Sequence, residues 1–234
     1  MFDLKSNAVL GKVKVREDAD GIIYDPASDK VLAVCGDAGV LVPISPKVDL
    51  SIGSADPAIQ LGGKPEFLAA DGKGKVFVNL VDKDQLAVVD LKTGTVLAHW
   101  PVAPGGAPVG LAIDPRKGRL FIGCRKPQKL IVMDCSDGKV LADLPIGRGV
   151  DAVVVDRGYA LASCGDGTLA VVGEGAPGHY GVVQTVTTGR GARTAGVDPK
   201  AHVVYLPTAE FEEAVGQARP RPKPDTFMVI KVSD

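Results

Sequence analysis

Charged side chains recur at one position of a repeated sequence unit. Asp20, Glu66, Asp151 and Arg193 each stand five residues before an aspartate that ends a short apolar run, and Val109 takes this position in the remaining unit. Carboxylate oxygens are the ligands that hard divalent cations prefer, and guanidinium groups bind oxyanions through paired hydrogen bonds. Such a ring of charges would bind a metal ion, a charged small molecule or a charged partner.

A second group of charges lies near the end of the chain, in the run RPRPKP over residues 219–224. Alternating prolines favour a stiff, extended polyproline conformation. We call Glu210 to Asp225 the strap and hypothesise that it lies across the acidic positions, as a lid or as a partner-facing surface. The alternative is a solvated face in which the charges only pair with one another, each exposed pair contributing about 0–1 kcal/mol. The residues expected to contact a ligand are Asp20, Glu66, Asp151, Arg193, Arg219 and Arg221.

The four cysteines show no arrangement for metal binding or a disulfide. Cys35, Cys124 and Cys164 take corresponding positions in different units, Cys135 has no obvious mate, and the sequence has no CxxC pair. A disulfide needs Cα atoms within about 4.4–6.8 Å, which corresponding positions of neighbouring units would exceed. We therefore interpret the cysteines as small buried core residues.

Histidines and glycine-rich turns also fail to make a catalytic or cofactor site. No histidine falls near the charged positions, so no nucleophile and base are placed within hydrogen-bond reach. Residues 147–152, GRGVDA, fit the pattern G-x-G-x-x-A, and residues 189–193, GRGAR, form the same turn one unit later. These turns lead into strands, and without a helix N-terminus they are not expected to bind a dinucleotide phosphate. No catalytic residue, metal ligand or cofactor is expected.

The aspartates that follow the charged positions define the repeat that must hold them. They recur 42 to 46 residues apart, a period typical of one four-stranded propeller blade, and are Asp25, Asp71, Asp114, Asp156 and Asp198. Each unit has four apolar runs separated by turns rich in glycine, proline and aspartate, with no helical period. The sequence predicts an all-β chain forming a single β-propeller domain over residues 1–234.

The two ends of the chain predict a divided blade. Residues 3–10 resemble residues 90–97, which places a fourth strand of a blade at Val9 to Val15, while Phe227 to Val232 forms a third strand with none after it. About five blades are therefore expected, four of them complete and one formed by, or split between, the chain ends. Either the first strand closes a five-bladed ring, or the chain is a fragment of a seven-bladed propeller.

Several phrases resemble the YVTN-type, or YncE-like, β-propeller proteins of bacteria. They are VDLKTGTV at 89–96, PVGLAIDP at 108–115 followed by RLFIG at 119–123, and GKV at 138–140 leading into LPIG at 144–147. The resemblance covers nearly the whole chain. It implies seven blades, usually an exported protein of the periplasm or cell exterior, and a function that is mostly undefined. The chain has about two blades fewer than this family.

The composition of the chain limits the classes of partner that it could bind. Lys plus Arg number 27 against 28 Asp plus Glu, and aromatic residues make up 5%, which disfavours a nucleic-acid-binding protein. The sequence lacks an apolar run long enough to span a membrane and lacks the basic start and apolar stretch of a signal peptide.

These observations favour a non-catalytic propeller that binds a protein, peptide or small ligand through its loops, with open blade edges able to associate if the chain is a fragment. A scaffold module without a small ligand is not distinguished from this function by the sequence. The alternative is a metal-assisted, lactonase-like hydrolase using Asp20, Glu66 and Asp151 as oxygen ligands.

Overall fold

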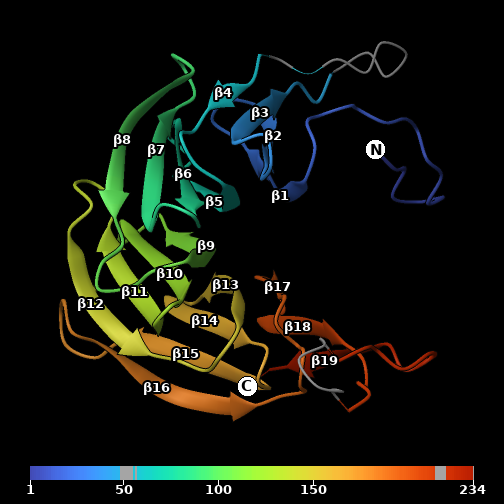
Figure 1. Cartoon of the computed structure of the whole chain (residues 1–234), viewed down its shortest axis with the longest axis vertical. Helices are drawn as coiled ribbons and strands as arrows, with labels where there is room; N and C mark the ends of the chain where they lie inside the picture. Colours follow the sequence, from blue (N-terminus) through green and yellow to red (C-terminus); the bar gives the residue numbers. More distant parts are fainter. Residues whose placement is uncertain (48–54, 56, 214–219, 234) are drawn as a thin grey trace. The chain divides into compact units, whose positions relative to one another are not determined.

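The chain is built from β-strands joined by turns and loops (Figure 1). This computed structural model describes residues 1–47, 55, 57–213 and 220–233, and no helix occurs among them. Consequently, no helix in the described part of the chain could cross a membrane. The strands gather into two compact units, Met1–Pro101 and Val102–Asp234, which are described separately. The prediction of one domain over residues 1–234 stays a prediction.

The first unit holds two antiparallel sheets of four strands each, in which the strands follow one another in chain order. The first sheet consists of β1 (Ala19–Asp25), β2 (Lys30–Cys35), β3 (Val40–Ile44) and β4 (Ile59–Gln60). The second consists of β5 (Pro65–Ala70), β6 (Lys75–Leu80), β7 (Gln85–Asp90) and β8 (Thr95–Pro101).

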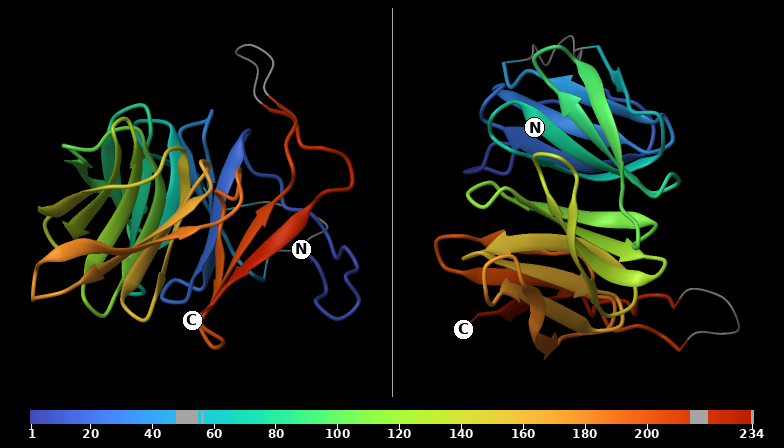
Figure 2. Two further views of the ribbon diagram at one scale, coloured as in Figure 1. Left: turned by 90° about the horizontal axis from the view of Figure 1, so that it is seen from below. Right: turned by 90° about the vertical axis from the view of Figure 1, so that its left-hand side faces the viewer.

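The second unit holds two more four-stranded sheets and a sheet with three described strands. Its first sheet consists of β9 (Pro108–Asp114), β10 (Arg119–Arg125), β11 (Gln128–Asp134) and β12 (Val140–Pro145). The next consists of β13 (Val150–Asp156), β14 (Tyr159–Cys164), β15 (Thr168–Glu174) and β16 (Tyr180–Thr187). The last consists of β17 (Gly196–Asp198), β18 (Val203–Thr208) and β19 (Met228–Val232). Figure 2 shows the strands of these sheets running side by side as twisted meanders. The prediction of an all-β chain with five propeller blades is confirmed.

The repeated aspartates are explained by the turn that joins the first two strands of a blade. The Asp71 carboxylate accepts hydrogen bonds from the backbone N–H of Lys73 at 2.7 Å and of Lys75 at 3.0 Å. Asp114 accepts one from the N–H of Arg116 at 3.0 Å. Aspartate is favoured here because its side chain replaces a missing backbone partner in the turn.

Asp156 is the exception, because its turn is shorter. Arg157 and Gly158 both have positive φ angles, 48° and 80°, as a two-residue hairpin turn requires. The Asp156 carboxylate instead hydrogen-bonds the His202 imidazole, with an Nδ1–Oδ1 distance of 3.0 Å.

The core lies between neighbouring sheets of the same unit. In the first unit, Leu32, Val34 and Leu41 of one sheet pack against Val76 and Val78 of the next. In the second unit, Phe121, Leu130 and Val132 pack against the sheet of β13–β16. The β14 strand of the second unit is covered on both faces, because Ala160 and Ala162 belong to this core and Leu161 packs against the last sheet.

The structure corrects the prediction of a strand at Val9 to Val15. No strand forms over these residues; Val9 makes an isolated β-bridge with Phe2, and Val13 and Val15 pack on the face of the β1–β4 sheet. Burial of two apolar side chains replaces strand pairing as the force that holds this segment.

Candidate functional site

The structure distributes the predicted ligand residues over both units. Asp20 lies on β1 and Glu66 on β5, in the first unit. Asp151 lies on β13 and Arg193 between β16 and β17, while Arg221 belongs to the β18–β19 connection, in the second unit. Arg219 lies outside the described residues. The predicted set remains a prediction.

In the first unit, a lysine organises the acidic residues around Asp20. The Lys64 ammonium contacts the Asp37 carboxylate at 2.9 Å and the Asp18 carboxylate at 3.2 Å. Hydrogen bonds to these two carboxylates raise the pKa of Lys64, and the Lys64 hydrogen bond lowers the pKa of Asp37. These groups are well exposed, so the pairs hold the local loops together more than they stabilise the fold.

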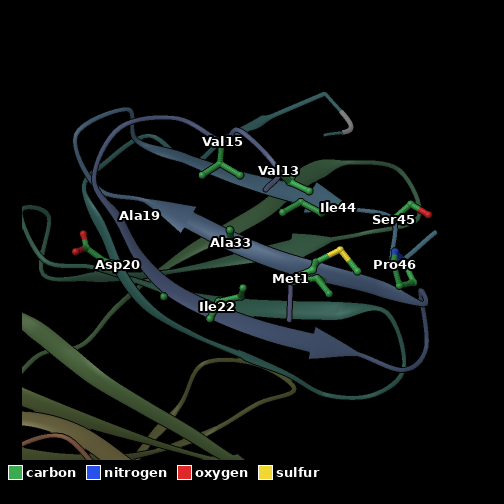
Figure 3. A pocket seen from close by; sticks show the side chains of 12 residues that line it. Met1, Val13, Val15, Ala19, Asp20, Ile22, Ala33, Ile44, Ser45 and Pro46 are labelled. Carbon is green, nitrogen blue, oxygen red and sulfur yellow. The ribbon is translucent and has the colours of Figure 1, made fainter. Parts of the chain in front are cut away.

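Asp20 is not part of this ion-pair group. Among the described residues its carboxylate has no ion pair or hydrogen bond, and partial burial, followed by repulsion from Asp18, raises its pKa above the ordinary value. It borders an apolar pocket on the β1–β4 sheet (Figure 3). Glu66 lies on the neighbouring β5 and is half-buried.

In the second unit, Asp151 is held between two arginines. The Arg125 guanidinium donates to one carboxylate oxygen of Asp151 and, at 2.9 Å, to the carbonyl oxygen of Val150. The Arg193 Nε lies 3.2 Å from the other oxygen. Both oxygens of Asp151 are thus engaged, and this carboxylate orients Arg193 rather than standing free for a cation.

A pocket of about 530 Å³ opens beside Arg193. Three arginines surround it, Phe211 and Pro220 from the strap form an apolar wall, and glycines and one aspartate complete the lining. We call this the arginine pocket, and its residues are Arg148, Gly149, Gly165, Asp166, Arg190, Gly191, Arg193, Phe211 and Pro220.

Two of the three guanidinium groups have no partner among the residues that the structure describes. In the part of the chain that the structure describes, neither Arg148 nor Arg190 has its side chain in an ion pair or a hydrogen bond, and both residues are exposed. Asp166 lines the pocket, but its oxygens accept from the N–H of Arg148 at 2.6 Å and from the Thr168 hydroxyl at 2.7 Å. Positive charge therefore exceeds negative charge in the pocket.

Backbone hydrogen bonds fix the turns that carry these arginines. The N–H of Gly165 donates to the carbonyl of Gly149 at 3.0 Å, and the N–H of Gly191 donates to the carbonyl of Gly165 at 2.9 Å. The Thr208 hydroxyl donates to the carbonyl of Arg190 at 2.8 Å. The turns from successive blades are thus tied in a row, and each arginine projects from a fixed backbone.

The described part of the strap closes one side of the pocket. Phe211 forms an isolated β-bridge with Pro222, and the N–H of Lys223 donates to the carbonyl of Glu210 at 2.8 Å. The Lys223 ammonium also pairs with the Glu210 carboxylate at 3.1 Å. The base of the strap is therefore a short paired ribbon whose side chains meet arginines at this pocket.

The sequence carries a signal for Arg148 and Arg190 in a turn that repeats from one unit to the next. The triplet Gly-Arg-Gly occurs at 147–149 and again 42 residues later, at 189–191, which is one repeat. The second glycine of each triplet has positive φ, 73° at Gly149 and 78° at Gly191. Phe211 carried no signal, because its position depends on how the strap folds.

The other residues that could carry chemistry are potential metal ligands, cysteines and histidines. No group of three or more His, Cys, Asp or Glu side chains in the described ranges is placed to hold a metal ion. Within the described ranges no disulfide joins the cysteines, and Cys35, Cys124 and Cys164 are buried as predicted, with burial raising the pKa of Cys164 to about 11. The His99 imidazole hydrogen-bonds the Leu61 carbonyl at 2.8 Å.

Comparison with known proteins shows the fold alone. No protein-family profile and no curated protein matches the sequence. The structure is similar to hydrazine synthase of Kuenenia stuttgartiensis, with a TM-score of 0.70 and 13% identity over 97% of this chain and 64% of that chain. A functionally unknown protein from Desulfotomaculum acetoxidans gives a TM-score of 0.76 and 12% identity over 90% of this chain and 69% of that chain. Streptogramin B lyase gives a TM-score of 0.67 and 10% identity over 83% of this chain and 64% of that chain.

These neighbours are β-propeller proteins, so the comparison supports the propeller fold deduced from the blades. The chain spans less than two thirds of the length of the hydrazine synthase and lyase chains, at 64% of each.

Proposed function

We propose that this chain is a non-catalytic β-propeller binding protein whose arginine pocket takes a compact oxyanion carried on an apolar group. The ligand is a small molecule or a side chain of a protein or peptide. One observation carries the proposal: the guanidinium groups of Arg148 and Arg190, which have no partner among the described residues, line a pocket that Phe211 also lines.

The charge distribution supports an anion over a cation. Arg148, Arg190 and Arg193 line the pocket, and Asp166, the one acidic residue in the described lining, already accepts hydrogen bonds at both oxygens. Planar guanidinium groups match the geometry of carboxylate and phosphate oxygens. A hydrogen bond to a charged group contributes about 1.5–3 kcal/mol, so two arginines are sufficient for a measurable affinity.

The lining supports binding without chemistry. The pocket residues include no serine, threonine, cysteine, histidine, lysine or tyrosine among those that the structure describes. Asp166 is fixed by the N–H of Arg148 and by Thr168, which opposes a role as a general base.

Titration calorimetry with phenyl phosphate tests the proposal, because this probe joins a dianion to an aromatic ring. We expect Arg148→Gln and Arg190→Gln each to weaken binding by about tenfold or more. Arg16→Gln is the matched control, because Arg16 is exposed in the first unit and its replacement removes the same charge. Equal affinities for the wild type and all three variants would refute the assignment.

Inorganic phosphate tests the arginines separately from Phe211, because it has no aromatic ring. Phe211→Ala is expected to weaken phenyl phosphate binding and leave phosphate binding unchanged, because only the ring contacts the apolar wall. The same loss for both probes would contradict the assigned role of Phe211.

We also propose that the chain belongs to the YVTN-type propellers and acts in the periplasm or outside the cell. The repeat phrases, such as VDLKTGTV at 89–96, support this proposal. Fractionation of the native host with an antibody against the protein tests it, since recovery in the cytoplasm would contradict it.

A further inference from the structure

Within each unit, a blade buries one face against the blade before it, and we call this its leading face. On the β5–β8 sheet the leading face comprises Leu68, Val76, Val78, Leu80, Ala87 and Val89, which pack against the β1–β4 sheet. On the β13–β16 sheet it comprises Val153, Ala160, Ala162, Cys164, Ala170 and Val172, which pack against the β9–β12 sheet. Strand register relates these sets, because Leu68 lies opposite Val78 and Val153 lies opposite Ala162.

The β1–β4 sheet has the same apolar face, and no other described blade of the first unit packs against it. Ile22 lies opposite Ala33, so it corresponds to Leu68 and Val153. The exposed fraction of Leu68 and of Val153 is 4%, whereas that of Ile22 is 70%. This comparison identifies a blade-packing face that the described residues of its own unit leave largely open.

The N-terminal segment covers only part of this face. Val13 and Val15 pack against the cluster that contains Ala33 and Ile44. Beside them remains a pocket of about 430 Å³, in which Ile22, Ala33 and Ile44 point toward the two valines (Figure 3). Apolar walls of this size on a water-exposed surface favour burial against a partner.

The last sheet exposes the complementary surface, the trailing face with which a blade meets the one after it. Val229 of β19 corresponds by register to Leu41 and Leu130, which are trailing-face residues with exposed fractions of 0%. The exposed fraction of Val229 is 51%. Tyr205, at the position of Phe121, is exposed as well.

Charges at the two faces are also complementary. In the second unit, Arg125 at the end of β10 pairs with Asp151 of the next blade. Asp20 takes the position of Asp151 in the first blade, and its carboxylate is unpaired among the described residues. The corresponding connection of the last sheet carries Arg221, whose guanidinium has no ion-pair partner in the described chain.

We propose that the leading face of one copy of this chain binds the trailing face of a second copy. Tyr205 and Val229 of one copy pack on Ile22 and the pocket beside Val13 of the other. A trailing face then meets a leading face, as it does between neighbouring blades within each unit. Because the two faces differ, the contact is head-to-tail, and each dimer retains one free face of each kind. Larger rings or open chains of copies then form as concentration rises.

Light scattering coupled to size-exclusion chromatography tests this proposal. The wild type is expected to form species whose mass increases with concentration. Ile22→Arg removes the leading face and Val229→Arg the trailing face, and each variant alone is expected to be monomeric. Both positions are exposed, so neither change disturbs the core. Leu97→Arg on β8 is the matched control, because this apolar residue is 53% exposed and the register of β7 and β8 skips it, pairing Val88 with Ala98 and Val89 with Val96.

The decisive sample is an equimolar mixture of the two monomeric variants. The intact trailing face of Ile22→Arg is expected to bind the intact leading face of Val229→Arg, giving a one-to-one dimer and nothing larger. A monomeric wild type would overturn the proposal, as would a mixture that stays monomeric or oligomers that persist in either variant.

Discussion

Substitution of Gly191 by alanine tests how the arginine pocket is built. Gly191 has a φ of 78°, and an alanine Cβ at this position would lie 2.4 Å from Cε2 of Phe211. The left-handed backbone costs a residue with a Cβ about 1–2 kcal/mol. Forcing a methyl group against the ring adds about 1–3 kcal/mol. Together these effects are expected to lower the free energy of unfolding by about 2–5 kcal/mol.

Gly178 provides a control that isolates the backbone cost. Its φ is 77°, yet an added Cβ would meet no atom within 4 Å. Gly178→Ala is therefore expected to cost only about 1–2 kcal/mol. In a Phe211→Ala background the steric part disappears, and Gly191→Ala is expected to cost about 1–2 kcal/mol there as well.

Urea unfolding followed by far-ultraviolet circular dichroism measures these differences. If Gly191→Ala costs no more than Gly178→Ala, or costs the same with and without the Phe211 ring, the contact between the turn and the strap is not made as described.

Three further predictions concern the core, the thiols and pH. Phe121→Ala is expected to lower the free energy of unfolding by about 3–5 kcal/mol in urea titrations, because this ring is fully buried between two blades; a loss below 1 kcal/mol would contradict that packing. Native Cys164 is expected to resist alkylation at neutral pH, since burial raises its pKa to about 11, while the half-buried Cys135 reacts first in a mass-spectrometric time course; the reverse order would count against this burial. Hydrogen bonds from Ser136 lower the pKa of Asp134, so their stabilisation is present above the unfolded pKa of about 3.9 and is lost as pH falls below it. Ser136→Ala is expected to flatten the fall of stability between neutral and acidic pH, and an unchanged pH profile would refute this.

The blades could be predicted from the sequence because local chemistry determines them. An aspartate such as Asp71 satisfies the backbone of its own turn, and a strand such as β14 is apolar on both faces because a sheet of the same unit covers each face. The strand expected at Val9 to Val15 shows the limit of this reasoning. Its alternating valines suit a strand, but a strand also needs a paired edge, and burial of Val13 and Val15 on a sheet face replaced it.

The candidate site was predictable only in part. Arg193 and Asp151 were selected by their place in the repeat, but the partner of Asp151, Arg125, comes from the preceding blade and depends on its register. The sequence places Arg148 in a turn, but its role depends on how the nearby Asp166 carboxylate is used: it accepts from the Arg148 backbone N–H and the Thr168 hydroxyl, which the sequence does not display.

A crystal structure of the protein with phenyl phosphate tests the central proposal most directly. We expect the phosphate oxygens within hydrogen-bond distance of the Arg148 and Arg190 guanidinium groups and the ring against Phe211. An empty arginine pocket at probe concentrations that saturate the calorimetric titration, or a probe bound elsewhere on the protein, would contradict it.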